Sequence, residues 1–287
     1  MTDWSWVDEH EPWEPEGFID LTRASPARIY DYLLGGKDNF DVDRIAADRA
    51  AQVAPWARDG ARACRAYLID AVRLMAGQVD QFLDIGSGLP TEMNVHEAVQ
   101  TVSPEARVLY VDYDALTLAH ARARLSYPPA GVGVMFGDLR RPGDILDDVE
   151  RTFGHLIRLD EPVGLVLSAI LHFITDADRA HQIVATLVDR LAPGSCLMIS
   201  HIVAGHDDQP SKDLRAAAGV YTSHAAVPLV VRTRAEIEAF FDDLTMIDPL
   251  HQLTHDGTPM PVLGGIGVKP TPAPADDDWL GDELGTP

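Results

Sequence analysis

Between residues 81 and 200, short apolar segments alternate with longer segments of helical character, and this alternation constrains the fold more than any other feature. The apolar segments are expected as strands at 81–85, 107–112, 132–136, 163–168 and 195–200. Strands that are apolar throughout are buried on both faces, and strands separated by helices pair in parallel. The pattern therefore predicts a parallel sheet covered by helices on both faces, with right-handed crossovers.

The segments between and after these strands extend the prediction. Helices are expected at 92–102, 115–125, 176–191 and 233–241, and two further strands at 244–247 and 262–268 form a hairpin-like pair. The expected fold class is therefore α/β, with a Rossmann-like seven-stranded, mostly parallel sheet. This is one strand more than the dinucleotide-binding Rossmann sheet has.

The segment before the sheet has the pattern of three helices. The first begins at Ser25-Pro26 and ends at Gly35-Gly36, and the others cover 43–53 and 57–76. Serine followed by proline is typical of a helix start, and glycine of a helix end. The expected division is an acidic tail at 1–19, an N-terminal helical cap at 20–77, a sheet domain at 78–269 and an acidic, proline-rich tail at 270–287.

Charge and composition exclude several classes of partner. The formal net charge of −22 repels a phosphate backbone, so no nucleic-acid partner is expected. No apolar run reaches the roughly 20 residues of a membrane span, and the N-terminus lacks the pattern of a signal peptide. Cys64 and Cys196 match no metal spacing, and His251 with His255 is too isolated for a metal site. A cytoplasmic protein with reduced thiols and no metal is expected, and its oligomeric state is left open.

The end of the first strand carries the first candidate binding motif, Asp84-Ile85-Gly86-Ser87-Gly88. Ligands of open α/β sheets bind outside the carboxyl ends of the strands, and glycines there let a ligand approach the backbone. The carboxylate of Asp84 could accept hydrogen bonds from a cationic amino group. Taken alone the motif is weak, because a tight structural turn has the same sequence.

The next two strands also end in aspartate. Asp112, with Tyr113 beside it, could accept hydrogen bonds from both ribose hydroxyls. The alternative for Asp112 is a helix N-cap, although Asp114 is better placed for that role. Asp138 could accept the amino group of adenine while the Leu139 amide donates to the ring, or it could be a solvated turn residue.

Three aspartates at consecutive strand ends predict a site for S-adenosylmethionine (SAM). Gly86, Ser87 and Gly88 complete the predicted methionine end, and Ser168 at the end of the fourth strand joins the cofactor set. A nicotinamide dinucleotide competes for the same residues. It is disfavoured because Pro90 follows where the G-x-G-x-x-G motif requires a later glycine.

At this point the sequence resembles a known family, the actinobacterial S-adenosyl methyltransferases, formerly a domain of unknown function. The matching stretches are SPARIYDYLLGGKDNF at 25–40, FLDIGSGLPT at 82–91, VDYD at 111–114 and LHF at 171–173. The resemblance extends over about 19–269 and implies a class I methyltransferase fold that binds SAM, without implying an acceptor. Pro90 departs from the broader class I pattern but agrees with this family.

The distinctive N-terminal block of the resemblance predicts a contact with the cofactor. Lys37 could pair with the cofactor carboxylate, Tyr30 or Tyr32 could line the pocket, and Asn39 lies in the same polar turn. The alternative is a purely structural junction between two helices, held by Asn39.

Histidines after the fourth and fifth strands are candidate general bases. His172 and, less favoured, His201 lie at the binding edge of the sheet, and Tyr30 is a further catalytic candidate. A base is not obligatory, because positioning alone can lower the barrier of an in-line methyl transfer by several kcal/mol, on the order of 7–11.

The sequence therefore predicts a cytoplasmic SAM-dependent methyltransferase that acts on an unidentified small molecule. The alternatives are a non-catalytic SAM sensor and, less favoured, a nicotinamide-dependent oxidoreductase. An apolar compartment beside the methyl group would favour the enzyme, and a pocket closed around the cofactor would favour the sensor.

Overall fold

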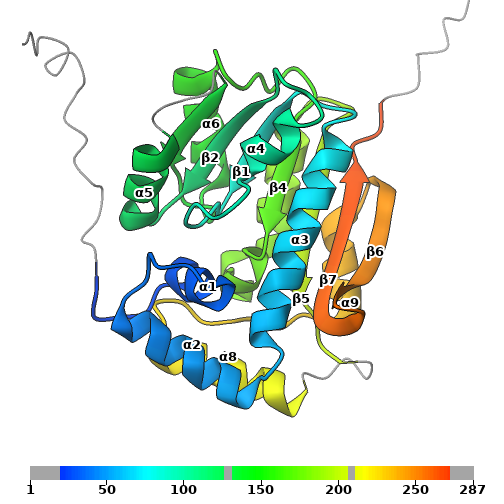
Figure 1. The fold of residues 1–287 in the computed structure, drawn as a ribbon. Coiled ribbons are helices and arrows are strands. Elements are labelled where there is room, and N and C mark those ends of the chain that lie inside the picture. Colours follow the sequence, from blue (N-terminus) through cyan, green and yellow to red (C-terminus); the bar gives the residue numbers. More distant parts are fainter. Residues whose placement is uncertain (1–19, 126–130, 206–210, 272–287) are drawn as a thin grey trace, which may run out of the picture.

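Seven strands form one sheet in the order β3-β2-β1-β4-β5-β7-β6 in the computed structural model, which describes residues 20–125, 131–205 and 211–271 (Figure 1). The neighbours from β3 to β5 are parallel, and β7 pairs antiparallel with β5 and β6. The strands are β1 (Gln81–Ile85), β2 (Arg107–Asp112), β3 (Val132–Phe136), β4 (Gly164–Ser168), β5 (Cys196–Ile202), β6 (Thr245–His255) and β7 (Thr258–Val268). The predicted Rossmann-like, mostly parallel sheet is confirmed.

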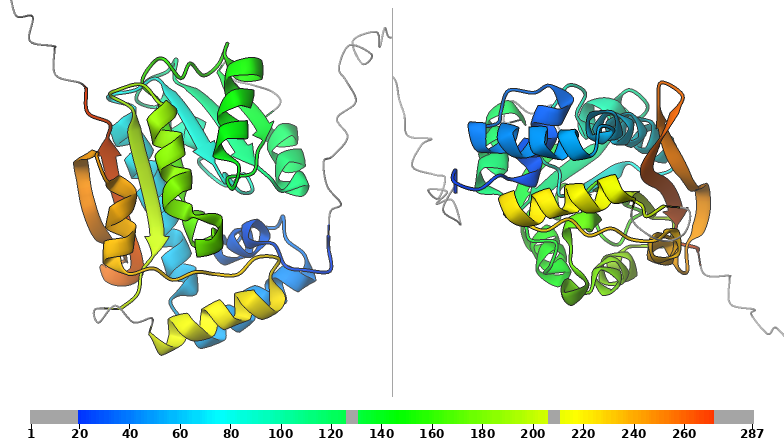
Figure 2. Two further views of the ribbon diagram at one scale, coloured as in Figure 1. Left: turned by 180° about the vertical axis from the view of Figure 1, so that it is seen from behind. Right: turned by 90° about the horizontal axis from the view of Figure 1, so that it is seen from below.

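Helices cover both faces of the sheet, as expected (Figures 1 and 2). Alternate strand side chains separate into two cores: Leu83 packs with α6 and α7, while Phe82 packs with α3 and α4. The α-helices are α1 (Pro26–Leu34), α2 (Asp41–Val53), α3 (Ala57–Met75), α4 (Val95–Gln100), α5 (Ala115–Leu125), α6 (Pro142–Phe153), α7 (Ala180–Arg190), α8 (Lys212–His224) and α9 (Arg234–Glu238). None of them, within the described ranges, has the length and apolar character to cross a membrane.

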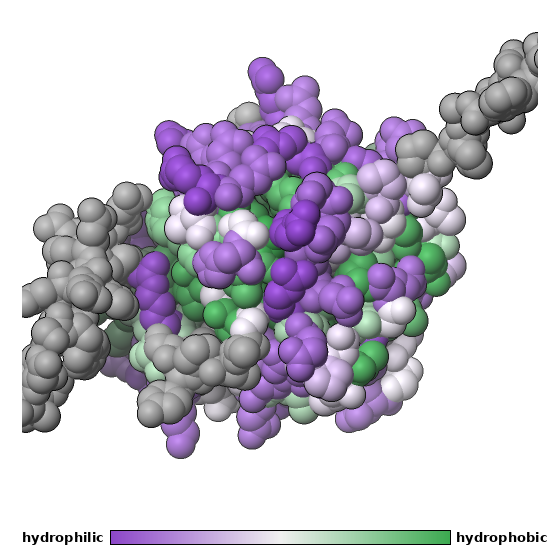
Figure 3. Space-filling view, turned by 90° about the horizontal axis from the view of Figure 1, so that it is seen from above, coloured by the Kyte–Doolittle hydropathy of each residue, from purple (hydrophilic) through white to green (hydrophobic). Residues whose placement is uncertain are grey.

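A cap of α1, α2 and α8 lies across the carboxyl ends of the parallel strands (Figure 2). It differs from the expected continuous cap over 20–77, because α3 packs along the sheet and α8 joins α2 from between β5 and β6. Ser25 is the N-cap residue of α1, but its hydroxyl accepts from no amide of its own helix and instead donates toward Asp114 at 3.4 Å. The face opposite the cap is largely hydrophilic (Figure 3).

Two helices and the length of the last hairpin were not predicted. Helix α8 has only Leu214 and Ala217 buried, so its amphipathic pattern is weak. Helix α6, in contrast, has proline at its start and three buried apolar residues, a pattern that the sequence does show.

Strands β6 and β7 extend to a two-residue turn at Asp256-Gly257, where both residues have positive φ, as Asp-Gly turns favour. Buried and exposed residues do not alternate regularly along β6, so the sequence pattern does not reveal the full length of this strand. Helix α4 starts only after the Asn94 capping box and is shorter than expected.

Candidate SAM and acceptor site

The carboxylate of Asp112 joins the turns that follow β1 and β2. One oxygen accepts from the Gly88 amide and the other from the Asp114 amide, each at 2.9 Å. Asp114 in turn caps α5 by accepting from the Thr117 amide at 2.9 Å, as its position predicted. Each carboxylate oxygen has two lone pairs, so Asp112 keeps acceptor capacity for a ligand.

Glycine is required at two positions of the turn after β1. Gly86 has φ +74°, and a Cβ there would lie 2.5 Å from the Ile170 Cγ1 atom. Gly88 has φ +66°, but a Cβ there would meet no protein atom within 4 Å. The space beside Gly88 is therefore open to a ligand.

Two buried carboxyl groups and an arginine lie together near the ends of β1 and β2. Burial raises the pKa of Asp84 to about 7, against the opposing effect of Arg65, and burial raises the pKa of Asp112 to about 6. Arg65 donates through Nη2 to the carbonyls of Glu92 and Met93, while its buried Nε has no hydrogen-bond partner in the described part of the chain. Sequence reasoning missed Arg65, which lies in α3 outside any motif.

The turn after β3 is held by an ion pair. Arg140 donates to both carboxylate oxygens of Asp138, at 2.7–3.0 Å, and its guanidinium lies 5.7 Å from the Tyr113 ring centroid. The hydrogen bonds to Arg140 lower the pKa of Asp138 against its partial burial, so this carboxylate stays ionised. Among the described residues the Leu139 amide has no acceptor, which leaves it available to a ligand.

One cavity brings the predicted strand-end residues together. Its lining includes the following predicted residues: Asp84, Gly86, Ser87, Gly88, Asp112, Tyr113, Asp138, Leu139, Ser168, Tyr30 and His172. The cavity continues from these polar strand ends to a predominantly apolar wall formed by the cap and α3. Its lining therefore offers two kinds of surface, a polar one at the strand ends and an apolar one beneath the cap.

Three predicted cofactor residues lie outside the lining of this cavity. Lys37 is exposed, and Tyr32 donates to Asp48 at 3.1 Å beneath the Arg58 guanidinium. Asn39 donates to the Asp31 carboxylate at 2.7 Å and to the Gly36 carbonyl at 3.0 Å. The structure does not bring these three side chains to the cofactor end.

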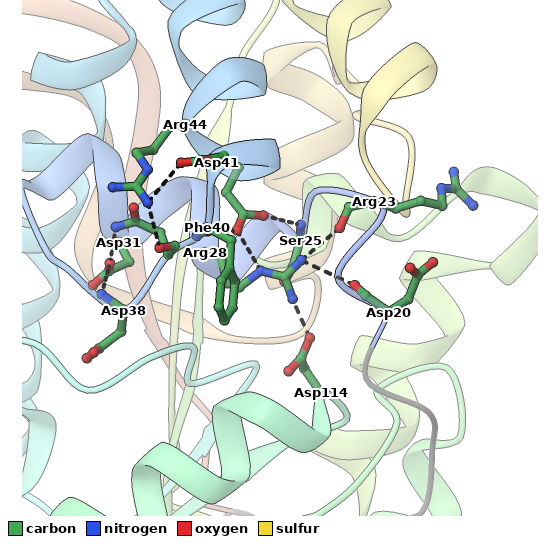
Figure 4. A network of polar contacts seen from close by, with 12 residues as sticks. Asp20, Arg23, Ser25, Arg28, Asp31, Asp38, Phe40, Asp41, Arg44 and Asp114 are labelled. Atoms are coloured by element: carbon green, nitrogen blue, oxygen red, sulfur yellow. Dashed lines mark hydrogen bonds and ion pairs between the residues drawn. The ribbon is translucent and has the colours of Figure 1, made fainter.

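The N-terminal block instead forms a polar network within the cap (Figure 4). The buried side chains of Arg28 and Asp43 pair at 2.8 Å, and Asp43 also accepts from the amides of Ser25 and Phe40 at 2.9 Å. Asp38 pairs with Arg124 of α5 at 2.8 Å, which ties the cap to the sheet domain. These contacts favour the structural junction that the sequence left as the alternative.

The two candidate histidines have different surroundings. His201 is fully buried, donates through Nδ1 to the Ile202 carbonyl and accepts from Arg232 at Nε2 over 3.0 Å. Burial, supported by Arg232, lowers the pKa of His201 to about 3. His172 lines the cavity, and neither ring nitrogen has a hydrogen-bond partner among the described residues. Only His172 is thus free to exchange a proton with a ligand.

Arg232, which sequence reasoning also missed, fixes the segment that carries His172. Its guanidinium is buried and donates to the carbonyls of Leu171 and Ile174, both at 2.8 Å. Burial, reinforced by His201 and Arg232, lowers the pKa of His172 well below its ordinary value, so the ring is neutral at pH 7. In the part of the chain that the structure describes, no group of acidic, histidine or cysteine side chains could hold a metal ion.

Comparison with known proteins decides the family. The family model described as S-adenosyl methyltransferase matches residues 13–256. The chain belongs to the S-adenosyl methyltransferase family. The enzyme is therefore SAM-dependent, as its strand-end residues predicted.

Solved structures agree with this assignment. A candidate methyltransferase from Thermobifida fusca YX is 34% identical, with a TM-score of 0.79 over 91% of this chain and 100% of that one. A DUF574 family protein from Streptomyces avermitilis MA-4680 is also 34% identical, with a TM-score of 0.79 over 88% and 100%. An O-methyltransferase family protein from Burkholderia thailandensis, at 13% identity and a TM-score of 0.51 over 78% and 63%, shares the fold. No curated protein matches the sequence.

The polar compartment fits the cofactor of the family. A bound ligand would use the open space beside Gly88, together with the Leu139 amide and the Arg65 Nε, for which no described residue is a partner. Asp84 and Arg65 line the same end, so an amino acid zwitterion finds a carboxylate and a guanidinium there. These residues suit the methionine, ribose and adenine parts of SAM.

Proposed function

We propose that this S-adenosyl methyltransferase transfers the methyl group to a small-molecule acceptor held in the apolar compartment beneath the cap. The observation that carries the proposal is the continuity of one cavity from the polar strand ends to that compartment. A sensor needs no second compartment, whereas an enzyme needs one for the acceptor. The net charge of −22 argues against a nucleic-acid acceptor.

The residues of the polar compartment would divide the cofactor among them. Asp84 would accept from the methionine ammonium and Arg65 would donate to its carboxylate, with Gly86, Ser87 and Gly88 providing a close backbone surface. Asp112 and Tyr113 would hold the ribose. Asp138, oriented by Arg140, would accept from the adenine amino group while the Leu139 amide donates to the ring. When bound, SAM supplies a methyl group made electrophilic by a sulfonium.

The remaining candidates have separate roles. Ser168 shares a hydrogen bond with Ser200 at 3.1 Å and would form the cavity floor between the two compartments. Tyr30 donates to the Ala61 carbonyl at 3.0 Å, and burial raises the pKa of Tyr30, so it would serve as a wall rather than a base. His172, neutral and unpartnered, is the candidate proton acceptor. We place the enzyme in the cytoplasm, since Cys64 and Cys196 are free thiols.

Calorimetric titration with SAM, and separately with a nicotinamide dinucleotide, tests the assignment. We expect SAM to bind with a dissociation constant near micromolar, about −8 kcal/mol, and the dinucleotide not to bind. Asp112→Asn keeps the shape of the side chain and should weaken SAM binding. Binding of the dinucleotide alone, or of neither compound, would overturn the proposed site.

Arg65→Met should weaken SAM binding by about 10- to 100-fold, because a charge-assisted hydrogen bond contributes about 1.5–3 kcal/mol. The matched control is Lys37→Ala, which removes an exposed cation outside the cavity and should leave the affinity unchanged. Calorimetry measures both, and thermal melting checks that each variant is folded. If Lys37→Ala weakens SAM binding more than Arg65→Met does, the cofactor carboxylate is bound by Lys37 and not by Arg65.

The affinity for SAM should fall as the pH falls from 7.5 to 5.5. Burial raises the pKa of Asp84 to about 7, so much of this carboxyl is protonated below neutrality, whereas an ammonium ligand requires the ionised form. Binding therefore releases a proton, and affinity rises with pH up to about 7 and then levels off, with a slope approaching about tenfold per unit below it. In Asp84→Asn the affinity for SAM should no longer depend on pH between 6 and 7.5. The remaining decrease in affinity, below about pH 6, would come from protonation of Asp112. An unchanged slope in Asp84→Asn would contradict this assignment.

A further inference from the structure

We propose that the methyl acceptor is a neutral, largely apolar ring compound that carries a hydroxyl group, and that Tyr221 and His172 recognise that hydroxyl. The inference rests on the proposed function, because it assigns the chemistry of the apolar compartment that lies beside the cofactor. Three independent properties of the compartment lead to it: the nature of its wall, its charge and its unpartnered polar atoms.

The wall beneath the cap is apolar and leaves room for a ring. It is formed by Leu33 of α1, Ala50 of α2, Trp56 at the start of α3, Ala217 of α8 and Leu229 of the following segment. The two alanines keep α2 and α8 from filling the space, and Trp56 supplies an aromatic surface. A sugar or an amino acid would lose its hydrogen bonds to water on such a wall without replacement, at a cost of about 1–3 kcal/mol for each polar group.

The charges that line the cavity exclude an anionic acceptor. Of the two lining arginines, Arg140 is paired with Asp138, and Arg65 lies at the methionine end, where it lowers the pKa of Asp84. Neither is available to a carboxylate or a phosphate on the acceptor. The lining carboxylates outnumber these two arginines and give the cavity a negative potential, which repels an anion further.

A cationic acceptor also lacks a partner in this compartment. Among the acidic residues of the lining, Asp178 is nearest to His172 in sequence. One of its carboxylate oxygens accepts from the amide and the hydroxyl of Thr175, at 3.1 and 2.6 Å. Asp114 accepts from the Thr117 amide and the Ser25 hydroxyl. Both carboxylates lie in turns of the sheet domain and not in the apolar wall beneath the cap, so the described lining favours a neutral acceptor.

Tyr221 and His172 are among the polar lining side chains that no described residue engages in a hydrogen bond. Tyr221 on α8 has no hydrogen bond from its hydroxyl to any described residue, and burial raises the pKa of Tyr221, so the hydroxyl keeps its proton. His172 is 95% buried, with both ring nitrogens free of partners in the described part of the chain. The Phe173 ring, next to His172, packs against the Tyr221 ring with centroids 5.5 Å apart. Both rings therefore contact Phe173 and belong to one wall, where the proposed acceptor hydroxyl would lie.

The reaction that follows is balanced by groups already named. The acceptor oxygen forms a bond to the methyl carbon, the carbon–sulfur bond breaks, and its electron pair stays on sulfur as a neutral thioether. The hydroxyl proton passes to the neutral imidazole of His172 and then to water. Tyr221 donates to the acceptor oxygen and orients it.

The test uses the full-length enzyme saturated with S-adenosylhomocysteine, titrated with 2-naphthol and with 2-naphthoic acid, which share a ring system and differ in charge. We expect 2-naphthol to bind and 2-naphthoate to bind at least about tenfold more weakly. Tyr221→Phe should weaken 2-naphthol binding by about 3- to 30-fold, the range of one hydrogen bond. Ala217→Leu should weaken it by filling the compartment, whereas Thr222→Phe on the exposed side of α8 should not. All three variants should still bind S-adenosylhomocysteine.

Labelled methyl transfer to 2-naphthol tests the proton acceptor. His172→Gln should lower the rate near pH 7 by about 10²-fold, and the rate should recover as the pH rises toward the ionisation of the naphthol itself. If His172→Gln lowers the rate of methyl transfer by the same factor at every pH, His172 does not accept the proton. Equal binding of the two probes, or no 2-naphthol binding to an enzyme that binds S-adenosylhomocysteine, would overturn the acceptor assignment alone. Failure to bind S-adenosylhomocysteine would overturn the proposed function instead.

Discussion

Replacing Asp43 with alanine is expected to lower the free energy of unfolding by about 3–5 kcal/mol. The pair between Arg28 and Asp43 is buried on both sides, with side-chain exposures of 3% and 0%. Its loss leaves the Arg28 guanidinium buried beside an alanine, and it also removes the acceptor of the Ser25 and Phe40 amides. Urea unfolding followed by circular dichroism measures the change.

An exposed ion pair on the same helix provides the control. Asp48 pairs with Arg58 at 3.2 Å, with side-chain exposures of 51% and 37%, so Asp48→Ala should cost less than about 1 kcal/mol. The double variant Arg28→Met/Asp43→Ala should lose less stability than the sum of the two single variants, because it no longer buries an unpaired charge. Equal losses for Asp43→Ala and Asp48→Ala would show that the cap network does not stabilise the fold.

Replacing Gly88 with alanine should abolish SAM binding at micromolar concentrations while leaving a folded protein. A left-handed φ costs a non-glycine residue roughly 1–2 kcal/mol, which a folded domain tolerates. The added Cβ meets no protein atom within 4 Å, so it enters the open space where the methionine end is proposed to lie. Calorimetry with SAM, together with thermal melting, separates the loss of affinity from the loss of stability.

Gly257→Ala is the matched control for backbone strain. Gly257 has φ +76°, a Cβ there would also meet no atom within 4 Å, and the residue lies in the β6–β7 turn outside the cavity lining. It should destabilise the fold as Gly88→Ala does and keep full affinity for SAM. Gly86→Ala should destabilise the fold more than either, since its Cβ collides with Ile170. If Gly88→Ala binds SAM as tightly as Gly257→Ala does, the cofactor does not occupy the space beside Gly88.

The N-terminal block shows how a distinctive motif can mislead about its role. Its polar residues favoured a cofactor contact through Lys37, whereas Asp31 and Asp43 are engaged by neighbouring backbone and side chains within the cap. A sequence distinguishes a ligand-binding residue from a network residue poorly, because both need polar groups at specific positions. The proposed carboxylate contact, Arg65, has no motif at all, because it reaches the site from the middle of an amphipathic helix.

The sequence by itself determined the parallel sheet and the group of polar residues at its edge. Continuously apolar strands and intervening helices are local patterns, and parallel strands necessarily bring their carboxyl ends, with Asp84, Asp112 and Asp138, to one side. Only the tertiary structure decided what covers that edge. Helix α8 meets α2, and Arg232 bonds the Leu171 carbonyl 61 residues away. Such contacts depend on how distant segments pack, and no local periodicity records them.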